Sequence, residues 1–212
     1  MSEVDVSPRV ASVPITHRPR SRSLWGLDWR DHFPRSFGEI SAHAASFDDA
    51  LPFIGRHYDA IFRRDPSTDR FLADPMTHAK RRFGAEMDAF ILRDQGEEIG
   101  TLIGHPTDWT TYYMRSVALL PRYRERHLLR DLVESTYGPL RDAGVERIEG
   151  DCSPGNLAMV RALTSLEFIP ISTYPSDRWG VQLRFVKYLR PEAEQVFVRQ
   201  FCNGHTNVLR PR

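Results

Sequence analysis

The chain has 212 residues, of which 41% are hydrophobic and 27% are charged, a composition that suits one globular domain with extensions. The formal net charge is +1, so no overall electrostatic field attracts nucleic acid or an anionic membrane, and we expect neither partner. No apolar run approaches the roughly 18 residues of a membrane span, and the N-terminus lacks the apolar segment of a secretory signal, so we expect a cytoplasmic protein.

Residues 1–36 are polar and rich in proline, arginine and serine, which predicts an N-terminal arm without a core of its own. Four apolar side chains in its second half are expected to dock the arm onto the domain: Trp25, Leu27, Trp29 and Phe33. The domain itself is expected to span residues 37–190 and to begin with a short strand at 37–43. Residues 191–212 form a C-terminal extension.

Two helices are predicted next. Ser46 and Asp49 have the spacing of a capping box, and apolar residues follow at helical intervals until Pro66 ends the helix. A second, short helix is expected between Pro75 and Phe83.

Three strands follow, at 89–92, 99–104 and 111–120, with turns between them. An amphipathic helix over 124–143 ends at Gly144, and Gly138-Pro139 are expected to kink or shorten it. A strand at 145–152 completes a right-handed parallel crossover with the strand at 111–120.

The remaining elements are a helix at 157–166, strands at 168–174 and 181–189, and a helix at 191–202. This order predicts the α/β class, with a mixed α+β sheet and helices on both of its faces.

Two local patterns carry a family resemblance. Residues 117–124 read Val-Ala-Leu-Leu-Pro-Arg-Tyr-Arg, an apolar strand that ends in Pro-x-Tyr-Arg before a loop. Downstream, Asn156 and Phe168 match the first and last positions of a second pattern. Together with the element order, these patterns resemble the GNAT N-acetyltransferase superfamily. The resemblance implies a mostly antiparallel sheet whose fourth and fifth strands are parallel and splay apart.

The resemblance also implies a donor, acetyl-CoA or another acyl-CoA, whose pantetheine arm pairs with the backbone of Val117 and Leu119. Its pyrophosphate would lie on backbone N–H groups at a helix N-terminus, where unpaired donors and the helix dipole favour anions. The resemblance places six loop residues and one downstream residue at the donor: Arg124, Glu125, Arg126, His127, Leu128, Leu129 and Asn156.

The loop departs from the family pattern of Arg/Gln-x-x-Gly-x-Gly/Ala, because bulky His127 and Leu129 stand at the two small positions. Three outcomes stay open at this point. The loop still binds phosphate with help from Arg124 and Arg126; the donor is the phosphopantetheine of an acyl carrier protein; or the loop has decayed in a protein that no longer acylates.

Candidates for the chemistry lie on the splayed strands. Tyr113 stands where some family members hold a glutamate base, and strand alternation places Glu149 and Asp151 on one face. Either carboxylate is a candidate base or a site for a cationic substrate; the alternative is a salt bridge to Arg147 or Arg115. The family's tyrosine acid is replaced by leucine at 163.

Two further side chains have competing interpretations. His105 either lines the acceptor pocket or packs in the hairpin, and Cys152 is interpreted as a small core residue. The two cysteines, Cys152 and Cys202, suggest reduced thiols, and no spacing predicts a metal site.

The sequence therefore predicts an N-acyltransferase that moves an acyl group, an acetyl group by expectation, from acyl-CoA to the amine of a small molecule or peptide, by direct attack in a ternary complex. The alternatives are a non-catalytic binding or sensing protein of the same fold, or an enzyme with a carrier-protein donor. The apolar residues of the C-terminal extension also allow a homodimer.

Overall fold

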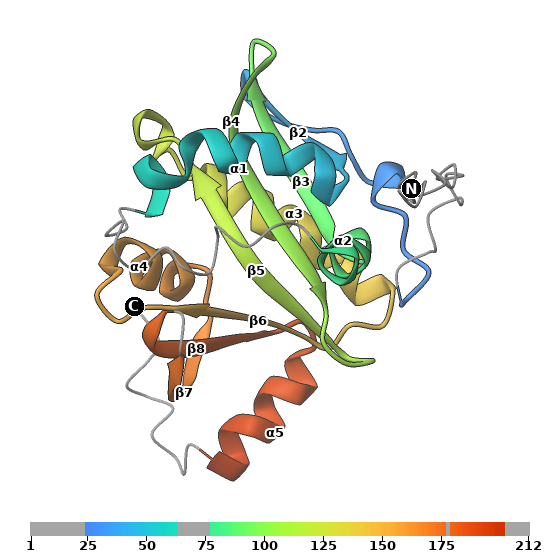
Figure 1. Cartoon of the computed structure of the whole chain (residues 1–212). Helices are drawn as coiled ribbons and strands as arrows, with labels where there is room; N and C mark the ends of the chain where they lie inside the picture. The colour runs from blue at the N-terminus through green and yellow to red at the C-terminus, as the bar shows by residue number, and fades with distance from the viewer. Residues whose placement is uncertain (1–23, 63–76, 177–178, 202–212) are drawn as a thin grey trace, which may run out of the picture.

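The structure is a computed structural model, and it describes residues 24–62, 77–176 and 179–201 (Figure 1). Most of the N-terminal arm, Pro66, Pro75 and Cys202 lie outside these ranges. No helix in the described ranges is long and apolar enough to cross a bilayer. The cytoplasmic location stays a prediction.

The centre of the protein is one eight-stranded sheet with the order β1-β2-β3-β4-β5-β6-β8-β7. All neighbouring strands are antiparallel except β5 and β6, which are parallel. The strands are β1 (Arg35–Phe37), β2 (Ile40–Ala45), β3 (Asp88–Asp94), β4 (Glu97–Pro106), β5 (Thr111–Leu119), β6 (Arg147–Cys152), β7 (Ile169–Ser176) and β8 (Gly180–Tyr188). The mixed sheet predicted from the sequence is confirmed.

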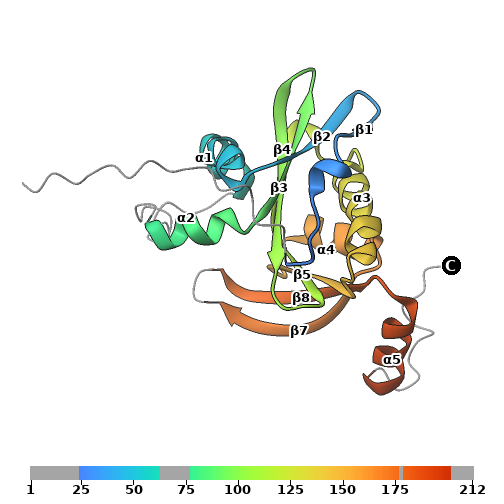
Figure 2. The ribbon, with the colours of Figure 1, turned by 90° about the vertical axis from the view of Figure 1, so that its right-hand side faces the viewer.

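Helices cover both faces of this sheet, as expected. In Figure 2, α1 and α2 lie on one side of the sheet, and α3 lies on the other side together with the N-terminal segment. The helices are α1 (Phe47–Phe62), α2 (His78–Ala85), α3 (Leu128–Asp142), α4 (Leu157–Ser165) and α5 (Pro191–Phe201), with 3-10 turns η1 (Trp29–Asp31) and η3 (Pro121–Tyr123).

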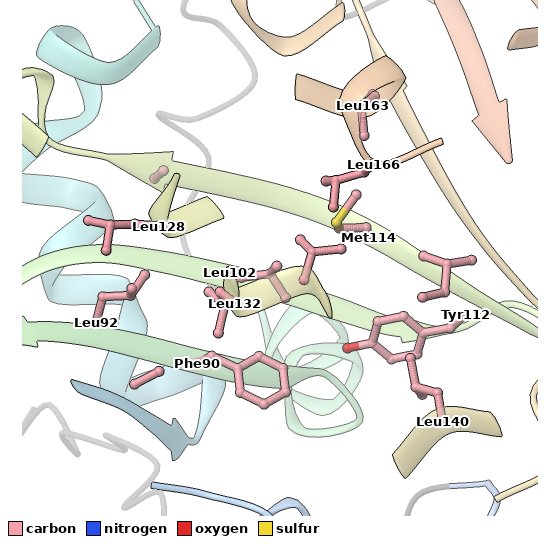
Figure 3. Packing of buried hydrophobic residues seen from close by; sticks show 14 of the residues in the cluster. Phe90, Leu92, Leu102, Tyr112, Met114, Leu128, Leu132, Leu140, Leu163 and Leu166 are labelled. Carbon is pink, nitrogen blue, oxygen red and sulfur yellow. The ribbon is translucent and has the colours of Figure 1, made fainter. Parts of the chain in front are cut away.

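The main core lies between the sheet and α3 (Figure 3). Every second residue of the central strands points to this side; on β5, Tyr112 and Met114 are buried against Leu132 and Leu140 of α3. Because alternate residues point to opposite faces, Tyr113 faces the side of α1 and α2. The alternation of side chains along β5 thus places Tyr112 and Met114 in the core and leaves Tyr113 on the opposite face, where it is available for chemistry.

The N-terminal segment docks onto this core through the aromatic residues expected to do so. The Trp29 ring packs edge-on against the Phe90 ring with 4.9 Å between centroids, and the centroid of the Phe33 ring lies 4.8 Å from that of Phe90. Trp25 donates a hydrogen bond of 2.8 Å to the carbonyl of Trp109 in the β4–β5 turn.

Two expectations about elements were wrong, and a third was wrong in part. The single strand at 37–43 is a hairpin of β1 and β2, turned by Gly38 with φ +66°. The helix expected from 124 begins at Leu128, after a 3-10 turn and an irregular loop. Pro139 does not shorten α3, which continues to Asp142 and is followed by Gly144 at φ +94°.

The capping box of α1 is confirmed. The Asp49 carboxylate accepts from the Ser46 N–H at 2.9 Å, and the Asp49 N–H donates to the Ser46 hydroxyl at 3.1 Å. These reciprocal bonds satisfy donors that a helix start leaves unpaired.

Candidate active site

The parallel strands β5 and β6 stay together for only four residue pairs. Thr111 pairs with Arg147 at one end of this stretch and Met114 pairs with Gly150 at the other. Beyond Met114, β5 continues along β4, while β6 continues along β8, so the two strands diverge (Figure 1). Residues 115–119 of β5 have no strand partner on the β6 side within the described chain; we call this the open edge of β5.

A β-bulge lies where the open edge begins. On β4, Ile103 pairs with Ser116 and Gly104 pairs with Met114, so Arg115 is the extra residue on β5. Bulges bend a strand and increase its twist, which turns β5 away from β6 at this point. Gly104 permits this geometry, because a Cβ there would lie 2.3 Å from the Tyr112 hydroxyl oxygen.

Val117 and Leu119 present their backbone groups to the open edge. The Leu120 N–H donates to the Ile99 carbonyl of β4 at 2.9 Å, so it points to the other edge. Successive backbone N–H groups of a strand point to opposite edges, which places the N–H groups of Leu119 and Val117 on the β6 side. The structure therefore leaves the N–H groups of both residues and the carbonyl of Val117 for an added extended chain, while the Leu119 carbonyl accepts from Nε of Arg124.

The loop between β5 and α3 adopts two left-handed residues where the sequence offers no glycine. Glu125 has φ +64° and His127 has φ +61°, and α3 begins directly after His127. Side chains other than glycine adopt this region at a cost of about 1–2 kcal/mol each. His127 thus keeps the backbone conformation that a glycine at this position would adopt without strain.

The first turn of α3 has unpaired backbone donors. No side chain caps the helix at His127, and the first backbone bond runs from the Asp131 N–H to the His127 carbonyl at 3.0 Å. Within the part of the chain that the structure describes, the N–H groups of Leu128, Leu129 and Arg130 have no acceptor. Such a helix start favours an anion.

The two leucines at the start of α3 pack toward the core. Leu128 is buried in the core, and Leu129 packs against it. The guanidinium of Arg126 lies 5.2 Å from the centroid of the Tyr123 ring, and Arg124 donates from Nε to the Leu119 carbonyl at 3.2 Å. Neither arginine forms an ion pair with a described carboxylate, so both charges remain available for a ligand.

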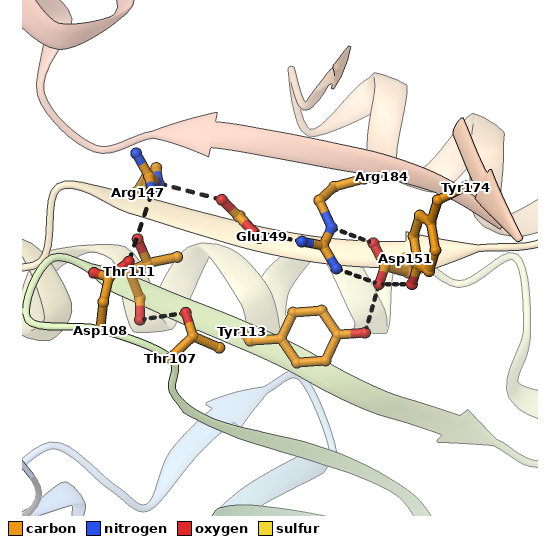
Figure 4. A network of polar contacts seen from close by, with 9 residues as sticks. All are labelled: Thr107, Asp108, Thr111, Tyr113, Arg147, Glu149, Asp151, Tyr174 and Arg184. Carbon is orange, nitrogen blue, oxygen red and sulfur yellow. Dashed lines mark hydrogen bonds and ion pairs between the residues drawn. The ribbon is translucent and has the colours of Figure 1, made fainter. Parts of the chain in front are cut away.

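On the opposite side of the sheet from α3, Asp151 organises a polar network (Figure 4). Its carboxylate accepts two hydrogen bonds from Arg184, at 2.9 and 3.0 Å, one from Tyr113 at 2.8 Å and one from Tyr174. The Asp151 side chain is only 6% exposed. Burial alone would raise its pKa, but the bonds from Arg184, Tyr174 and Tyr113 outweigh burial and hold the pKa below its usual range.

Glu149 is held more loosely than Asp151, although both lie on the same face of β6. Its side chain is 13% exposed and lies 3.2 Å from Nε of Arg147 and 3.5 Å from Nη1 of Arg184. Neither contact is a well-aligned hydrogen bond, and Nε of Arg147 is buried without a hydrogen-bond partner among the described groups. The salt bridge to Arg147 considered from the sequence is confirmed, and the network leaves Glu149 oxygens for a further donor.

His105, Tyr113 and Glu149 form a row across three strands. Tyr113 of β5 pairs with His105 of β4 on one side and with Glu149 of β6 on the other. Paired residues of adjacent strands share a face about 4.8 Å apart. Burial and the negative charge of Asp151 raise the pKa of Tyr113, so its hydroxyl stays protonated and donates.

The sequence profile of the GNAT acetyltransferase family matches residues 52–168, which is more than half of the chain. The chain belongs to the GNAT acetyltransferase family. A search of curated proteins found no match to it.

Solved structures agree with this GNAT fold. A GNAT-family protein from Desulfovibrio desulfuricans covers 71% of the chain over 99% of its own length, with a TM-score of 0.57 and 12% identity. The ribosomal-protein-S5-alanine acetyltransferase of Vibrio fischeri aligns with 75% of the chain over 98% of its own length, with a TM-score of 0.56 and 16% identity. The protein yncA of Salmonella typhimurium, solved with its cofactor acetyl-CoA, aligns with 73% of the chain over 96% of its own length, with a TM-score of 0.52 and 19% identity. At these identities the likeness concerns the fold.

Three other residues singled out in this GNAT chain have structural positions. Asn156 caps α4, where its side-chain oxygen accepts from the Met159 N–H at 3.2 Å. Leu163, at the family's tyrosine position, is buried with 2% exposure. Cys152 is a buried free cysteine, and burial raises the pKa of its thiol, in keeping with a core residue.

The described residues hold no group of three or more histidines, cysteines or carboxylates that could bind a metal ion. Sequence reasoning missed Arg184 and Tyr174, the partners of Asp151. Both lie more than twenty residues after Asp151 in the sequence, and no local pattern marks them. The catalytic and donor-binding roles of the predicted residues stay predictions.

Proposed function

We propose that this protein transfers an acyl group, an acetyl group in the first instance, from acyl-CoA to the amine of a small molecule or peptide. The observation that carries the proposal is the divergence of β5 and β6 after Met114 and Gly150. It leaves an unpaired strand edge next to a helix start with unpaired N–H groups. An extended pantetheine arm with a pyrophosphate at one end needs these two features in this order.

The donor would be held along the open edge of β5. Val117 and Leu119 would pair with the pantetheine amides, and one backbone N–H would stabilise the developing oxyanion of the thioester carbonyl. The pyrophosphate would accept from the backbone of residues 124–129, with charge-assisted bonds from Arg124 and Arg126. The left-handed His127 and the inward-facing Leu129 support this reading over a decayed loop.

The acceptor would lie on the opposite side, above Tyr113. We assign Asp151 to positioning, because a carboxylate that accepts four hydrogen bonds and has a lowered pKa is a poor proton acceptor. Glu149, with unfilled acceptor sites, is the better group to attract the ammonium form of an amine or to accept its proton. Tyr113 would contribute a hydrogen bond.

The reaction in this scheme forms a bond from the amine nitrogen to the acyl carbon and breaks the carbon–sulfur bond. The amine loses one proton to a base, and the thiolate leaves. Leu163 cannot protonate that thiolate, so the departing group would rely on solvent. General acid assistance is worth about 10²–10⁴-fold, so its loss slows turnover without preventing it.

The test is a two-stage measurement on the full chain. Thermal shift with acetyl-CoA, longer acyl-CoAs and CoA reports donor binding, and thiol release from acetyl-CoA with a panel of small amines, amino acids and peptides reports transfer. We expect stabilisation by acetyl-CoA and amine-dependent thiol release. Binding of acetyl-CoA without thiol release in the presence of any amine favours a sensing protein. Amine-dependent thiol release only from an acylated carrier protein favours that donor. Either result contradicts the proposal.

A further inference from the structure

The imidazole of His105 uses one ring nitrogen in a hydrogen bond and leaves the other without a partner among the described residues. Its Nδ1 lies 2.9 Å from the Pro106 carbonyl oxygen. A carbonyl only accepts, so Nδ1 carries the proton and Nε2 has a free lone pair. Nε2 is buried and has no hydrogen-bond partner within the described chain. A buried polar atom left unpaired is costly, and a functional role is one reason for a protein to keep it.

The surroundings of the ring keep it neutral. Phe83 of α2 and Tyr113 of β5 pack against it, each with 5.5 Å between ring centroids. Among the described residues, Arg115 of β5, the bulged residue, is the charged group that acts on the ring, and Tyr113 stays protonated. Burial, assisted by the positive charge of Arg115, lowers the pKa of His105 below its usual range despite the opposing bond to Pro106.

The position of His105 relates it to the proposed acceptor site. It pairs with Tyr113 across β4 and β5, and Tyr113 pairs with Glu149 across β5 and β6. An amine bound above Tyr113 therefore lies between an anionic carboxylate on one side and a neutral imidazole on the other. The carboxylate attracts the ammonium form, and the imidazole can take its proton.

The geometry points to His105 as the general base that removes the proton from the acceptor amine through Nε2, with Glu149 as the group that attracts the amine. This inference rests on the proposed acyl transfer. The proton moves from the amine nitrogen to Nε2 as the nitrogen bonds to the acyl carbon, and the imidazolium then returns it to solvent. Because Nε2 is buried, a neighbouring side chain has to move for the amine to reach it, and the proposal assigns this movement to Phe83, which packs on the ring and is 51% exposed.

The decisive variant is His105→Asn. An asparagine amide can still donate to the Pro106 carbonyl, but its side chain ends short of the Nε2 position and has no basic nitrogen. With the best amine from the panel, we expect kcat to fall about 10²–10⁴-fold while the thermal shift by acetyl-CoA is unchanged. In a plot of log(kcat/KM) against pH, wild type should show an extra unit of slope below the pKa of His105. The His105→Asn variant should lose this extra slope. His43→Asn, on β2 and outside the site, should leave all three readouts as in wild type.

A histidine ¹⁵N NMR titration tests the same assignment without an acceptor. The signal that His105→Asn removes should show a proton on Nδ1 and none on Nε2 at pH 7, and it should titrate below the ordinary value of 6.5. A proton on Nε2 overturns the inference, as does a variant that keeps the wild-type rate and pH profile while Glu149→Gln loses them. If wild type binds acetyl-CoA but acylates no amine, the proposed function fails and the inference fails with it.

Discussion

Tyr113 donates a hydrogen bond of 2.8 Å to Asp151 across the strand pair β5 and β6, at the place where the two strands begin to part. The bond ties the last paired stretch of the sheet together on the face of α1 and α2. From Thr111 to Met114 of β5 the two strands are joined by backbone pairing, and after Met114 they are separate. The network around Asp151 therefore stabilises the strand geometry on which the proposed donor binding depends.

Asp151→Asn should destabilise the fold. The substitution removes the charge that Arg184, Tyr174 and Tyr113 surround, and leaves buried donors poorly satisfied. We expect a loss of about 1–3 kcal/mol in the free energy of unfolding, measured with urea. Glu134→Gln, which breaks the exposed pair with Arg130 on α3, should cost less than about 0.5 kcal/mol. Equal effects of the two variants would contradict this account of the network.

The same carboxylate predicts an acid dependence of stability. Its folded pKa is lowered, so its contribution is present above its unfolded value, near the ordinary 3.8, and is lost as the pH falls through the folded pKa. The stability difference between wild type and Asp151→Asn should thus be constant from pH 7 to 5 and shrink below pH of about 4. Urea titrations at several pH values measure it; a difference that grows on acidification would have the wrong sign.

Gly104→Ala tests the bulge. The new Cβ would lie 2.3 Å from the Tyr112 hydroxyl oxygen, and Tyr112 is fully buried. We expect a loss of about 1–3 kcal/mol or more, because neither strand can move without breaking the pairing. The matched control is Gly55→Ala in α1, where nothing lies within 4 Å and alanine should stabilise the helix by about 0.5–1 kcal/mol.

His127→Gly tests the strain in the loop. At φ +61° a glycine is unstrained, so the variant should gain about 1 kcal/mol in the free energy of unfolding. Arg126→Gly, at a neighbouring position without a positive φ, should lose stability instead, because glycine gains freedom in the unfolded chain. A loss on His127→Gly would mean that its imidazole makes contacts that offset the strain.

Arg124→Ala and Arg126→Ala test the charges proposed for the phosphates. Each should raise the Kd for acetyl-CoA about tenfold, measured by calorimetry, and should weaken its dependence on salt. Arg141→Ala, in the last turn of α3, should leave the Kd unchanged. If all three variants bind like wild type, the phosphates of the donor lie elsewhere.

The sequence allowed much of the fold to be predicted, because each long element has a clear period. The capping box of Ser46 and Asp49 and the alternation of Glu149 and Asp151 are local features, and both hold in the structure. The hairpin at Gly38 was missed because its two strands are too short to show a period.

The site was predicted less well than the fold, because its interactions are non-local. Residue identity alone suggested that Leu129 obstructs the loop, whereas the direction of the helix turns this side chain into the core. Equally, spacing could not separate Glu149 from Asp151, because the partners that distinguish them, above all Arg184, come from another strand.

The most direct test of donor binding at the open edge of β5 is backbone amide exchange, measured by NMR with and without acetyl-CoA. In the free protein, the amides of Val117 and Leu119 should exchange quickly and that of Ala118, which points to β4, slowly. Saturation with acetyl-CoA should slow Val117 and Leu119 at least about tenfold, since each gains a hydrogen bond worth about 1.4 kcal/mol or more. If both amides are already as slow as Ala118 in the free protein, or keep their rates when acetyl-CoA binds, the edge is not the donor site.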